Sequence, residues 1–114
     1  MKVEFTRLDG DSPQIDSGSD AMDLIGKAFF EKTKTIVIEQ AQLSPRFFDL
    51  SSGLAGDVLQ KVSNYRMQLV IVGDFSGYES KSLRDFMYES NKNGQVIFAE
   101  DIERGLSMLK GPFF

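Results

Sequence analysis

Short runs of β-branched and other apolar residues alternate with amphipathic segments along this chain of 114 residues. Three such runs occupy residues 34–39, 69–72 and 96–99. Their continuous apolar centres are typical of strands that are covered on both faces. Stretches with apolar residues at helical spacing separate them, as in parallel sheets whose strands are joined by right-handed crossover helices. The pattern therefore predicts one α/β domain over residues 1–114, with a mainly parallel sheet.

The remaining segments complete this alternation. Val3 and Phe5 alternate with charged residues, which predicts an N-terminal edge strand over residues 2–8. Residues 14–15 fit either a short strand or a loop. We expect four amphipathic helices, whose candidate N-terminal caps are Ser19 or Asp20, Ser51 or Ser52, Ser80 or Ser82 (the latter in a capping box with Asp85), and Asp101. The apolar positions predicted for the four helices, in chain order, are Ala21, Leu24, Ile25, Ala28 and Phe29; Leu54, Val58, Leu59, Val62 and Tyr65; Leu83, Phe86, Met87 and Tyr88; and Ile102, Leu106 and Leu109. We expect Gly111 and Pro112 to end the last helix.

The absence of certain residue types limits the classes of function that the chain can have. It contains no histidine and no cysteine, so a Ser-His-Asp or Cys-His mechanism and a disulfide are all excluded. A formal net charge of -4 without a basic stripe argues against nucleic-acid binding. No apolar run approaches bilayer length, and the charged N-terminus does not read as a secretory signal. We therefore expect a cytoplasmic binding or signalling module that is not an enzyme, with no cofactor, no metal and no membrane partner.

The stretch from Phe47 to Leu54 carries the most specific functional signal. Ser51, Ser52 and Gly53 lie between a run of aromatic residues and the second predicted helix. Such hydroxyls can cap a helix by accepting hydrogen bonds from its first N–H groups. They can also receive a phosphate, which a helix N-terminus favours and which would add about two negative charges to a docking surface. Both interpretations can hold together, because an exposed capping hydroxyl is also accessible to a kinase.

This stretch resembles a motif of STAS domains, which occur in sulfate transporters and anti-sigma factor antagonists. Those domains share the predicted order of elements and carry an Asp-Ser-Ser/Thr-Gly-Leu motif at the start of the corresponding helix, and residues 51–54 match its last four positions. In anti-sigma factor antagonists, a partner kinase phosphorylates the first hydroxyl after the aspartate, and the phosphate disrupts binding to that kinase. The resemblance implies that Ser51 is a phosphoacceptor and that a kinase of the anti-sigma type is a partner. Leu50 stands where that family has the aspartate, and Asp49 lies one position earlier.

Residues 47–91 as a whole also resemble an uncharacterised bacterial family of small STAS-like proteins. The resemblance includes Gly73-Asp74-Phe75-Ser76 and the segment 80–86. Because the activity of that family is not established, the resemblance implies a fold and leaves the function open.

A second candidate site follows the strand at 69–72. In parallel sheets, sites form in the loops at the carboxyl ends of the strands, which here are 39–51, 73–82 and 99–102. Asp74 could bind magnesium or accept a phosphoryl group, or it could anchor a turn together with Ser76. Lys81 and Arg84 could hold an anion near a helix start, or they could simply be solvated.

Aromatic residues are unusually frequent in these loops. Phe47, Phe48, Phe75 and Tyr78 could form an exposed docking surface, or they could fold inward and cover the ends of the core. The terminal pair Phe113-Phe114 could pack back on the domain or contact another subunit.

These observations favour a small regulatory or protein-interaction module with an unidentified protein partner. Its expected surface comprises Arg46, Phe47, Phe48, Asp49, Ser52, Gly53, Asp74, Phe75, Ser76, Lys81 and Arg84, around the phosphoacceptor Ser51. An alternative is a small-ligand or anion-binding domain that uses two helix N-termini, at Ser52 and Ser82, on one end of the sheet. A third reading is a homo-oligomer assembled through the aromatic C-terminus.

Overall fold

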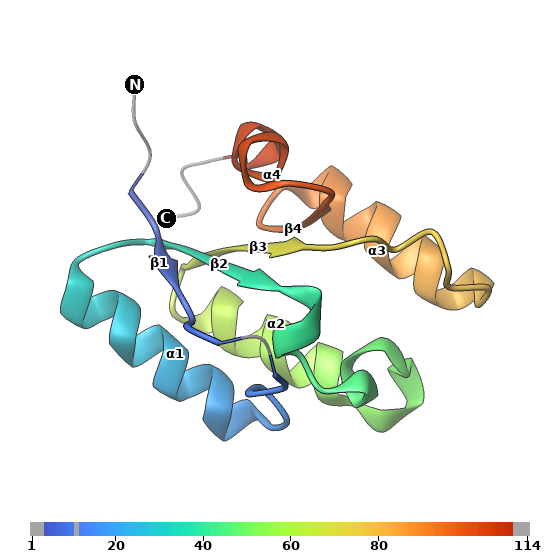
Figure 1. Cartoon of the computed structure of the whole chain (residues 1–114), viewed down its shortest axis with the longest axis horizontal. Coiled ribbons are helices and arrows are strands. Elements are labelled where there is room, and N and C mark those ends of the chain that lie inside the picture. The colour runs from blue at the N-terminus through green and yellow to red at the C-terminus, as the bar shows by residue number, and fades with distance from the viewer. Residues whose placement is uncertain (1–3, 11, 111–114) are drawn as a thin grey trace.

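A computed structural model of the chain describes residues 4–10 and 12–110. At its centre is a four-stranded sheet in which every strand is parallel to its neighbours. The strands β1 (Thr6–Arg7), β2 (Thr35–Glu39), β3 (Gln68–Val72) and β4 (Val96–Ala99) lie side by side in chain order (Figure 1). The predicted α/β fold with a parallel sheet is confirmed, and the three apolar runs each match a strand to within one residue.

Four α-helices in the described residues cover the two faces of the sheet: α1 (Gly18–Glu31), α2 (Leu54–Asn64), α3 (Lys81–Asn93) and α4 (Ile102–Met108). Each of the first three joins two neighbouring strands, and every crossover moves across the sheet in the same direction. Right-handed crossovers that all move one way place their helices on one face. Accordingly, α1, α2 and α3 share one apolar core, whereas α4 packs on the opposite face (Figure 1).

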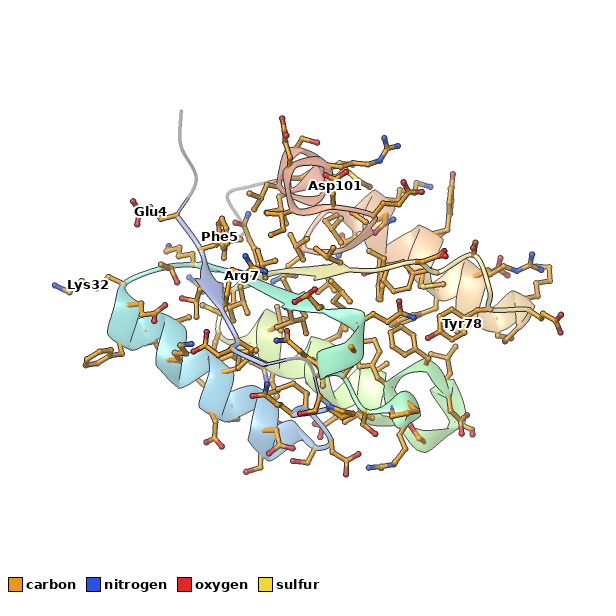
Figure 2. The ribbon with its side chains drawn as sticks, in the orientation of Figure 1. Glu4, Phe5, Arg7, Lys32, Tyr78 and Asp101 are labelled. Atoms are coloured by element: carbon orange, nitrogen blue, oxygen red, sulfur yellow. The ribbon has the colours of Figure 1, made fainter. Side chains whose placement is uncertain are left out.

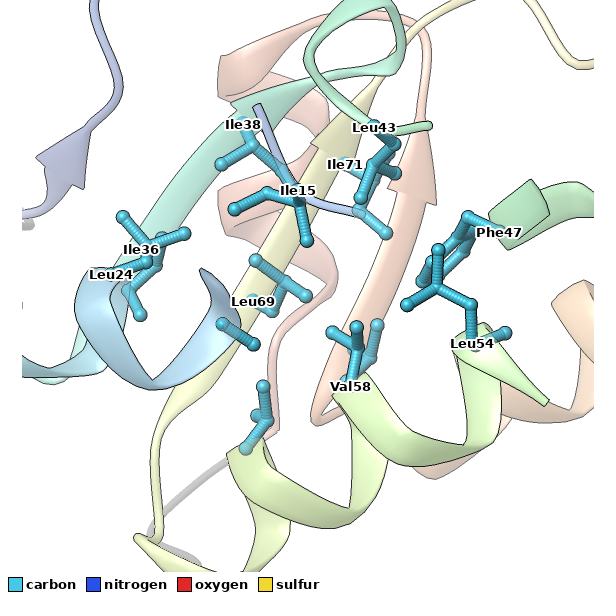
Figure 3. Packing of buried hydrophobic residues seen from close by; sticks show 14 of the residues in the cluster. Ile15, Leu24, Ile36, Ile38, Leu43, Phe47, Leu54, Val58, Leu69 and Ile71 are labelled. Carbon is cyan, nitrogen blue, oxygen red and sulfur yellow. The ribbon is translucent and has the colours of Figure 1, made fainter. Parts of the chain in front are cut away.

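The core has two layers because successive side chains of a strand point to opposite faces. The larger layer contains Ile36, Ile38, Leu69 and Ile71 together with Leu24, Phe47 and Val58 (Figure 3). The smaller layer contains Val37, Val70, Ile97 and Ala99 beneath α4. Gly105 lets α4 approach the sheet closely, since a Cβ at this position would lie 2.3 Å from Val70 Cγ1. Burial on both faces explains why the strands lack a polar alternation.

The N-terminal strand lies at the edge of the sheet as predicted, but its described part is short. It pairs with β2 over Thr6 and Arg7 alone, and Val3 lies outside the described residues. Thr6 is buried, and its hydroxyl donates to Glu31 Oε1 at 2.7 Å. Between the two alternatives for residues 14–15, the structure shows a single parallel bridge from the buried Ile15 to Leu43.

The predicted cap of α1 is wrong by two or three residues, and of the two candidates for α3 the structure confirms Ser80. Helix α1 is capped by Ser17, whose Oγ accepts a hydrogen bond from the N–H of Asp20 at 3.1 Å, and not by Ser19 or Asp20. Helix α3 is capped by Ser80, whose Oγ accepts from the N–H of Leu83 at 3.2 Å, and not by a Ser82–Asp85 capping box. In both places several polar residues precede the apolar pattern, and only the backbone geometry selects the one with an extended conformation.

The cap of the last helix is confirmed. Asp101 Oδ1 accepts a hydrogen bond from the N–H of Arg104 at 2.7 Å. Helix α4 ends at Met108, and the predicted stop at residues 111–112 lies outside the described residues. No helix in the described part of the chain is long and apolar enough to cross a membrane.

Three residues predicted on apolar helix faces are exposed instead. Phe29, Tyr65 and Tyr88 expose 54%, 44% and 67% of their surface. Phe29 and Tyr65 lie at the ends of α1 and α2 and contact each other. Tyr88 directly follows the buried Met87, and consecutive helix residues are about 100° apart, so Tyr88 lies off the buried side of α3.

Candidate functional site

The segment that joins β2 to α2 is built from short 3₁₀ turns. The turn Pro45–Phe48 is followed by the turn Leu50–Ser52, and α2 begins two residues later than the start predicted at Ser52. Gly53 separates the last turn from the helix with a φ of 81°, a left-handed conformation that glycine adopts at little cost. Ser51 is therefore part of an exposed turn at the carboxyl end of the sheet, directly before α2.

Asp49 holds this turn through its carboxylate. Asp49 Oδ1 accepts hydrogen bonds from both the N–H of Ser51, at 3.1 Å, and its hydroxyl, at 2.6 Å. The aspartate that stands one position early in the sequence is thus in direct contact with the Ser51 hydroxyl. A phosphate on Ser51 would remove this hydroxyl donor and place its negative charge beside the carboxylate.

The N-cap of α2 is Gly53, and not Ser51 or Ser52 as predicted, although the Ser52 hydroxyl still accepts from the first N–H of the helix. The same hydroxyl donates to the carbonyl oxygen of Arg46 at 2.5 Å and accepts from the N–H of Leu54 at 3.2 Å. The two serines of the motif therefore have separate roles: Ser52 is half-buried and structural, whereas Ser51 is exposed.

The turn after β3 repeats the same arrangement. Asp74 Oδ1 accepts from the N–H of Ser76 at 3.0 Å and from its hydroxyl at 2.7 Å. The hydroxyl of Ser76, followed by its N–H, lowers the pKa of Asp74 below the ordinary value of 3.8. These contacts support the turn-anchor interpretation of Asp74. No group of three or more acidic residues placed to hold a metal ion occurs among the described residues.

Gln40 ties this turn to the end of β2. Its side-chain carbonyl accepts from the N–H of Asp74 at 3.1 Å, and its amide donates to the hydroxyl of Tyr78 at 2.9 Å. The loops after β2 and β3 therefore form one continuous surface, as the topology predicts. Sequence reasoning did not identify Gln40, because a lone glutamine carries no recognisable pattern.

The loop aromatics pack mainly on one another. Phe47 is fully buried and cannot line a docking surface, so its assignment to that surface is wrong. Phe48 is partly buried and stacks on Tyr78 with a centroid separation of 4.9 Å. Phe75, also partly buried, meets Phe98 edge to face at 5.4 Å. The rings cover the end of the larger core layer, and Phe48, Phe75 and Tyr78 show only part of their surface to solvent.

Arg46 is already engaged by an acidic neighbour. Its guanidinium donates to the carboxylate of Asp16 at 3.1 Å and to the backbone carbonyl of the same residue at 3.0 Å. A hydrogen bond from Ser44, and then the one from Arg46, lowers the pKa of Asp16. Arg46 and Asp16 border a shallow hollow of about 270 Å³ between the starts of α1 and α2, which the carboxylate of Asp57 also lines.

The helix starts that lie together are those of α1 and α2, and not those of α2 and α3. Gly18 at the start of α1 is buried so close to α2 that a Cβ there would lie 2.2 Å from Asp57 Oδ2. At the start of α3, Lys81 instead forms an exposed ion pair with Asp85 at 2.7 Å. Lys81 and Arg84 do not line the hollow near Ser52.

A second exposed surface was not predicted from the sequence. Phe29, Lys32, Tyr65 and Arg66 line a hollow at the opposite end of the sheet, where α1 and α2 end. The available signal was an aromatic and a basic residue within four positions of each other at the ends of the first two predicted helices, in Phe29-Phe30-Glu31-Lys32 and Tyr65-Arg66.

The fold and the site define a small parallel α/β domain with two polar turns at the carboxyl end of its sheet. The chain belongs to the family described as Domain of unknown function (DUF4180), whose model matches residues 1–109. Neither a curated protein nor a solved structure matches the chain.

Proposed function

We propose that this protein is a non-enzymatic, cytoplasmic interaction module whose binding surface is switched by phosphorylation of Ser51. The observation that carries the proposal is the exposed Ser51 hydroxyl, 2.6 Å from Asp49 Oδ1 and directly before α2. The resemblance of residues 51–54 to the STAS motif supports the same assignment. A kinase of the anti-sigma type is the partner that this resemblance suggests.

The contacts of Ser51 explain how a phosphate there would change the proposed binding surface. Phosphorylation would add about two negative charges next to the Asp49 carboxylate and remove the hydroxyl donor. The resulting repulsion would displace Asp49 from the N–H of Ser51, which it also accepts at 3.1 Å. The turn Leu50–Ser52 would then rearrange, and with it the exposed surface formed with Phe48 and the 73–78 loop.

The experiment compares partner capture by Ser51→Asp and Ser51→Ala variants. The first variant brings a second carboxylate beside Asp49, whereas the second removes the hydroxyl and keeps the backbone hydrogen bond. We expect the Ser51→Ala protein to retain a specific partner that the Ser51→Asp protein loses. Ser107→Asp is the matched control, because it adds the same charge on exposed α4, on the other face of the sheet. Identical partner profiles for both Ser51 variants would contradict the proposal, as would an equal loss in the Ser107→Asp control.

The anion-binding alternative has less support. Arg46 is paired with Asp16, and Asp57 adds a second carboxylate to the hollow near Ser52. A small anion would meet these carboxylates at the two helix starts, which opposes the attraction of the helix N-termini.

A further inference from the structure

Exposed aromatic rings lie at the end of the sheet opposite to Ser51, where α1 and α2 end. Phe29 and Tyr65 meet edge to face with a centroid separation of 6.1 Å, although both are exposed. Phe30, the next residue along α1, is 87% exposed. These are three of the four large hydrophobic side chains that are exposed among the described residues. Exposed rings that gather at one place are typical of a surface that a partner covers.

Basic residues surround these rings. We define the aromatic–basic patch as Phe29, Lys32, Lys34, Tyr65 and Arg66. Together with Thr33 and Met67 they line a hollow of about 500 Å³ between the ends of α1 and α2. This volume lies within the range of about 300–1,000 Å³ that is common for ligand pockets. The hollow is large enough to receive a side chain of a bound segment, and its walls are rings and the aliphatic parts of basic side chains.

The charge of the patch is opposite to that of the whole chain. The exposed cations Lys32 and Arg66 line the hollow, and its lining includes no carboxylate among the residues that the structure describes, although the chain has a formal net charge of -4. Lys32 projects outward from this end of the molecule (Figure 2). By contrast, the hollow near Ser52 contains Asp16 and Asp57. The patch is therefore complementary to an acidic partner.

The backbone at two of the cations adds an independent observation. Lys32 and Arg66 have φ values of 59° and 56°, and they are the two non-glycine residues with positive φ in the described part of the chain. Lys32 directly follows the last residue of α1, and Arg66 lies two residues after the last residue of α2. Glycine is the usual residue with positive φ after a helix, because it adopts this conformation without steric cost. The helix macrodipole favours cations near these ends, but it does not explain the exposed rings beside them. Basic side chains thus occupy positions where glycine would serve the fold better.

We propose that the aromatic–basic patch binds an acidic peptide segment of a partner protein. One aromatic or large apolar side chain of the segment enters the hollow beside the Phe29–Tyr65 ring pair, and flanking carboxylates pair with Lys32 and Arg66. A peptide is favoured over a membrane surface because the rings line a concavity that receives a side chain. The proposal does not depend on the role of Ser51, which lies at the other end of the sheet.

The test uses the full chain and a defined probe. The probe is a fluorescein-labelled, C-terminally amidated peptide with one phenylalanine flanked on each side by three glutamates, and binding is read by fluorescence anisotropy. We expect saturable binding that weakens as salt is raised, because added salt screens exposed charges. Replacing the phenylalanine of the probe by alanine should weaken binding, and replacing its glutamates by lysines should abolish it.

The key variant is the Lys32→Gly and Arg66→Gly double substitution. It removes two charges while relieving two left-handed conformations, so its thermal midpoint should equal or exceed that of the wild type. Affinity for the probe should fall about tenfold, which corresponds to about 1.4 kcal/mol. The matched control is the Lys92→Gln and Arg104→Gln double variant, which makes the same change of net charge at exposed positions outside the patch.

Four results would overturn the proposal. The first is a wild-type protein that does not bind the probe, and the second is a glycine double variant that binds as tightly as the wild type. The third is an equal loss of affinity in the control, which would mean nonspecific attraction. The fourth is cosedimentation with phosphatidylserine–phosphatidylcholine vesicles without any binding of the probe, which would assign the patch to a membrane surface.

Discussion

At the scale of single residues, the chain uses one arrangement twice at the carboxyl end of its sheet. Asp49 accepts the N–H and hydroxyl of Ser51, and Asp74 accepts the same two groups of Ser76. Because the arrangement recurs, the hydrogen bonds by themselves describe a turn and do not identify a switch. What distinguishes Ser51 is its place directly before α2 and the motif around it.

The first prediction concerns the titration of Asp74. The Ser76 hydroxyl lowers its pKa below 3.8, so the ionised carboxylate stabilises the fold at higher pH, and this contribution is lost as the pH falls through the lowered pKa. Ser76→Ala should move the pKa of Asp74 back toward 3.8 in an NMR titration of the carboxyl carbon. Ser107→Ala should leave it unchanged, because the Ser107 hydroxyl donates to the carbonyl oxygen of Arg104 and not to Asp74. A wild-type midpoint at or above 3.8 would contradict the hydrogen bonding described here.

A second prediction at this scale compares two glycines in helices. Gly105→Ala places a Cβ 2.3 Å from Val70 Cγ1, so overpacking should lower the free energy of unfolding by about 1–3 kcal/mol. Gly26→Ala meets nothing within 4 Å in α1 and should raise it by about 0.5–1 kcal/mol, since alanine restricts the unfolded chain. Urea denaturation of both variants measures the two changes. Equal effects would show that α4 does not approach the sheet as closely as the structure indicates.

At the scale of elements, the strands could be predicted because burial on both faces leaves an uninterrupted apolar run. The cap residues of α1 and α3 could not be singled out from the sequence, since several serines and aspartates precede each helix and only the backbone conformation selects one. The burial of the aromatic side chains could not be predicted from the sequence either. Phe47 is buried by contacts with residues far away in the chain, whereas Phe29 is exposed at the end of α1.

The third prediction tests the cap of α3 directly. Ser80→Ala removes the hydroxyl that accepts from the N–H of Leu83 and should lower the free energy of unfolding by about 1 kcal/mol. Ser82→Ala changes an exposed position within the first turn and should stay within about 0.5 kcal/mol of the wild type. Chemical denaturation of the pair measures both values. A larger effect at Ser82 than at Ser80 would restore the capping box predicted from the sequence.

At the scale of the whole molecule, the parallel sheet separates two surfaces of different charge. Its carboxyl end carries the Ser51 turn and the carboxylates of Asp16 and Asp57, and its other end carries the aromatic–basic patch. Because every crossover runs in the same direction, α1 and α2 lie side by side. One hollow lies between the starts of the two helices, and another lies between their ends. The two surfaces that we propose for partners thus lie at opposite ends of the sheet.

The fourth prediction follows from this separation. Ser51→Asp should change capture of the partner at the carboxyl end while leaving the affinity of the patch for the acidic phenylalanine probe unaltered. Exposed charges separated by more than the Debye length, about 8 Å at physiological ionic strength, are largely screened from each other. Fluorescence anisotropy with the Ser51→Asp protein measures this affinity. A severalfold change in it would mean that the two ends are coupled through the fold.

The most direct measurement on the central claim is phosphopeptide mass spectrometry of the protein purified from the cells that naturally produce it. The account predicts a phosphate on Ser51, with Ser52 unmodified because its hydroxyl is held by Arg46 and Leu54. A Ser51 peptide recovered only in the unmodified form, across growth conditions in which the protein is present, would contradict it.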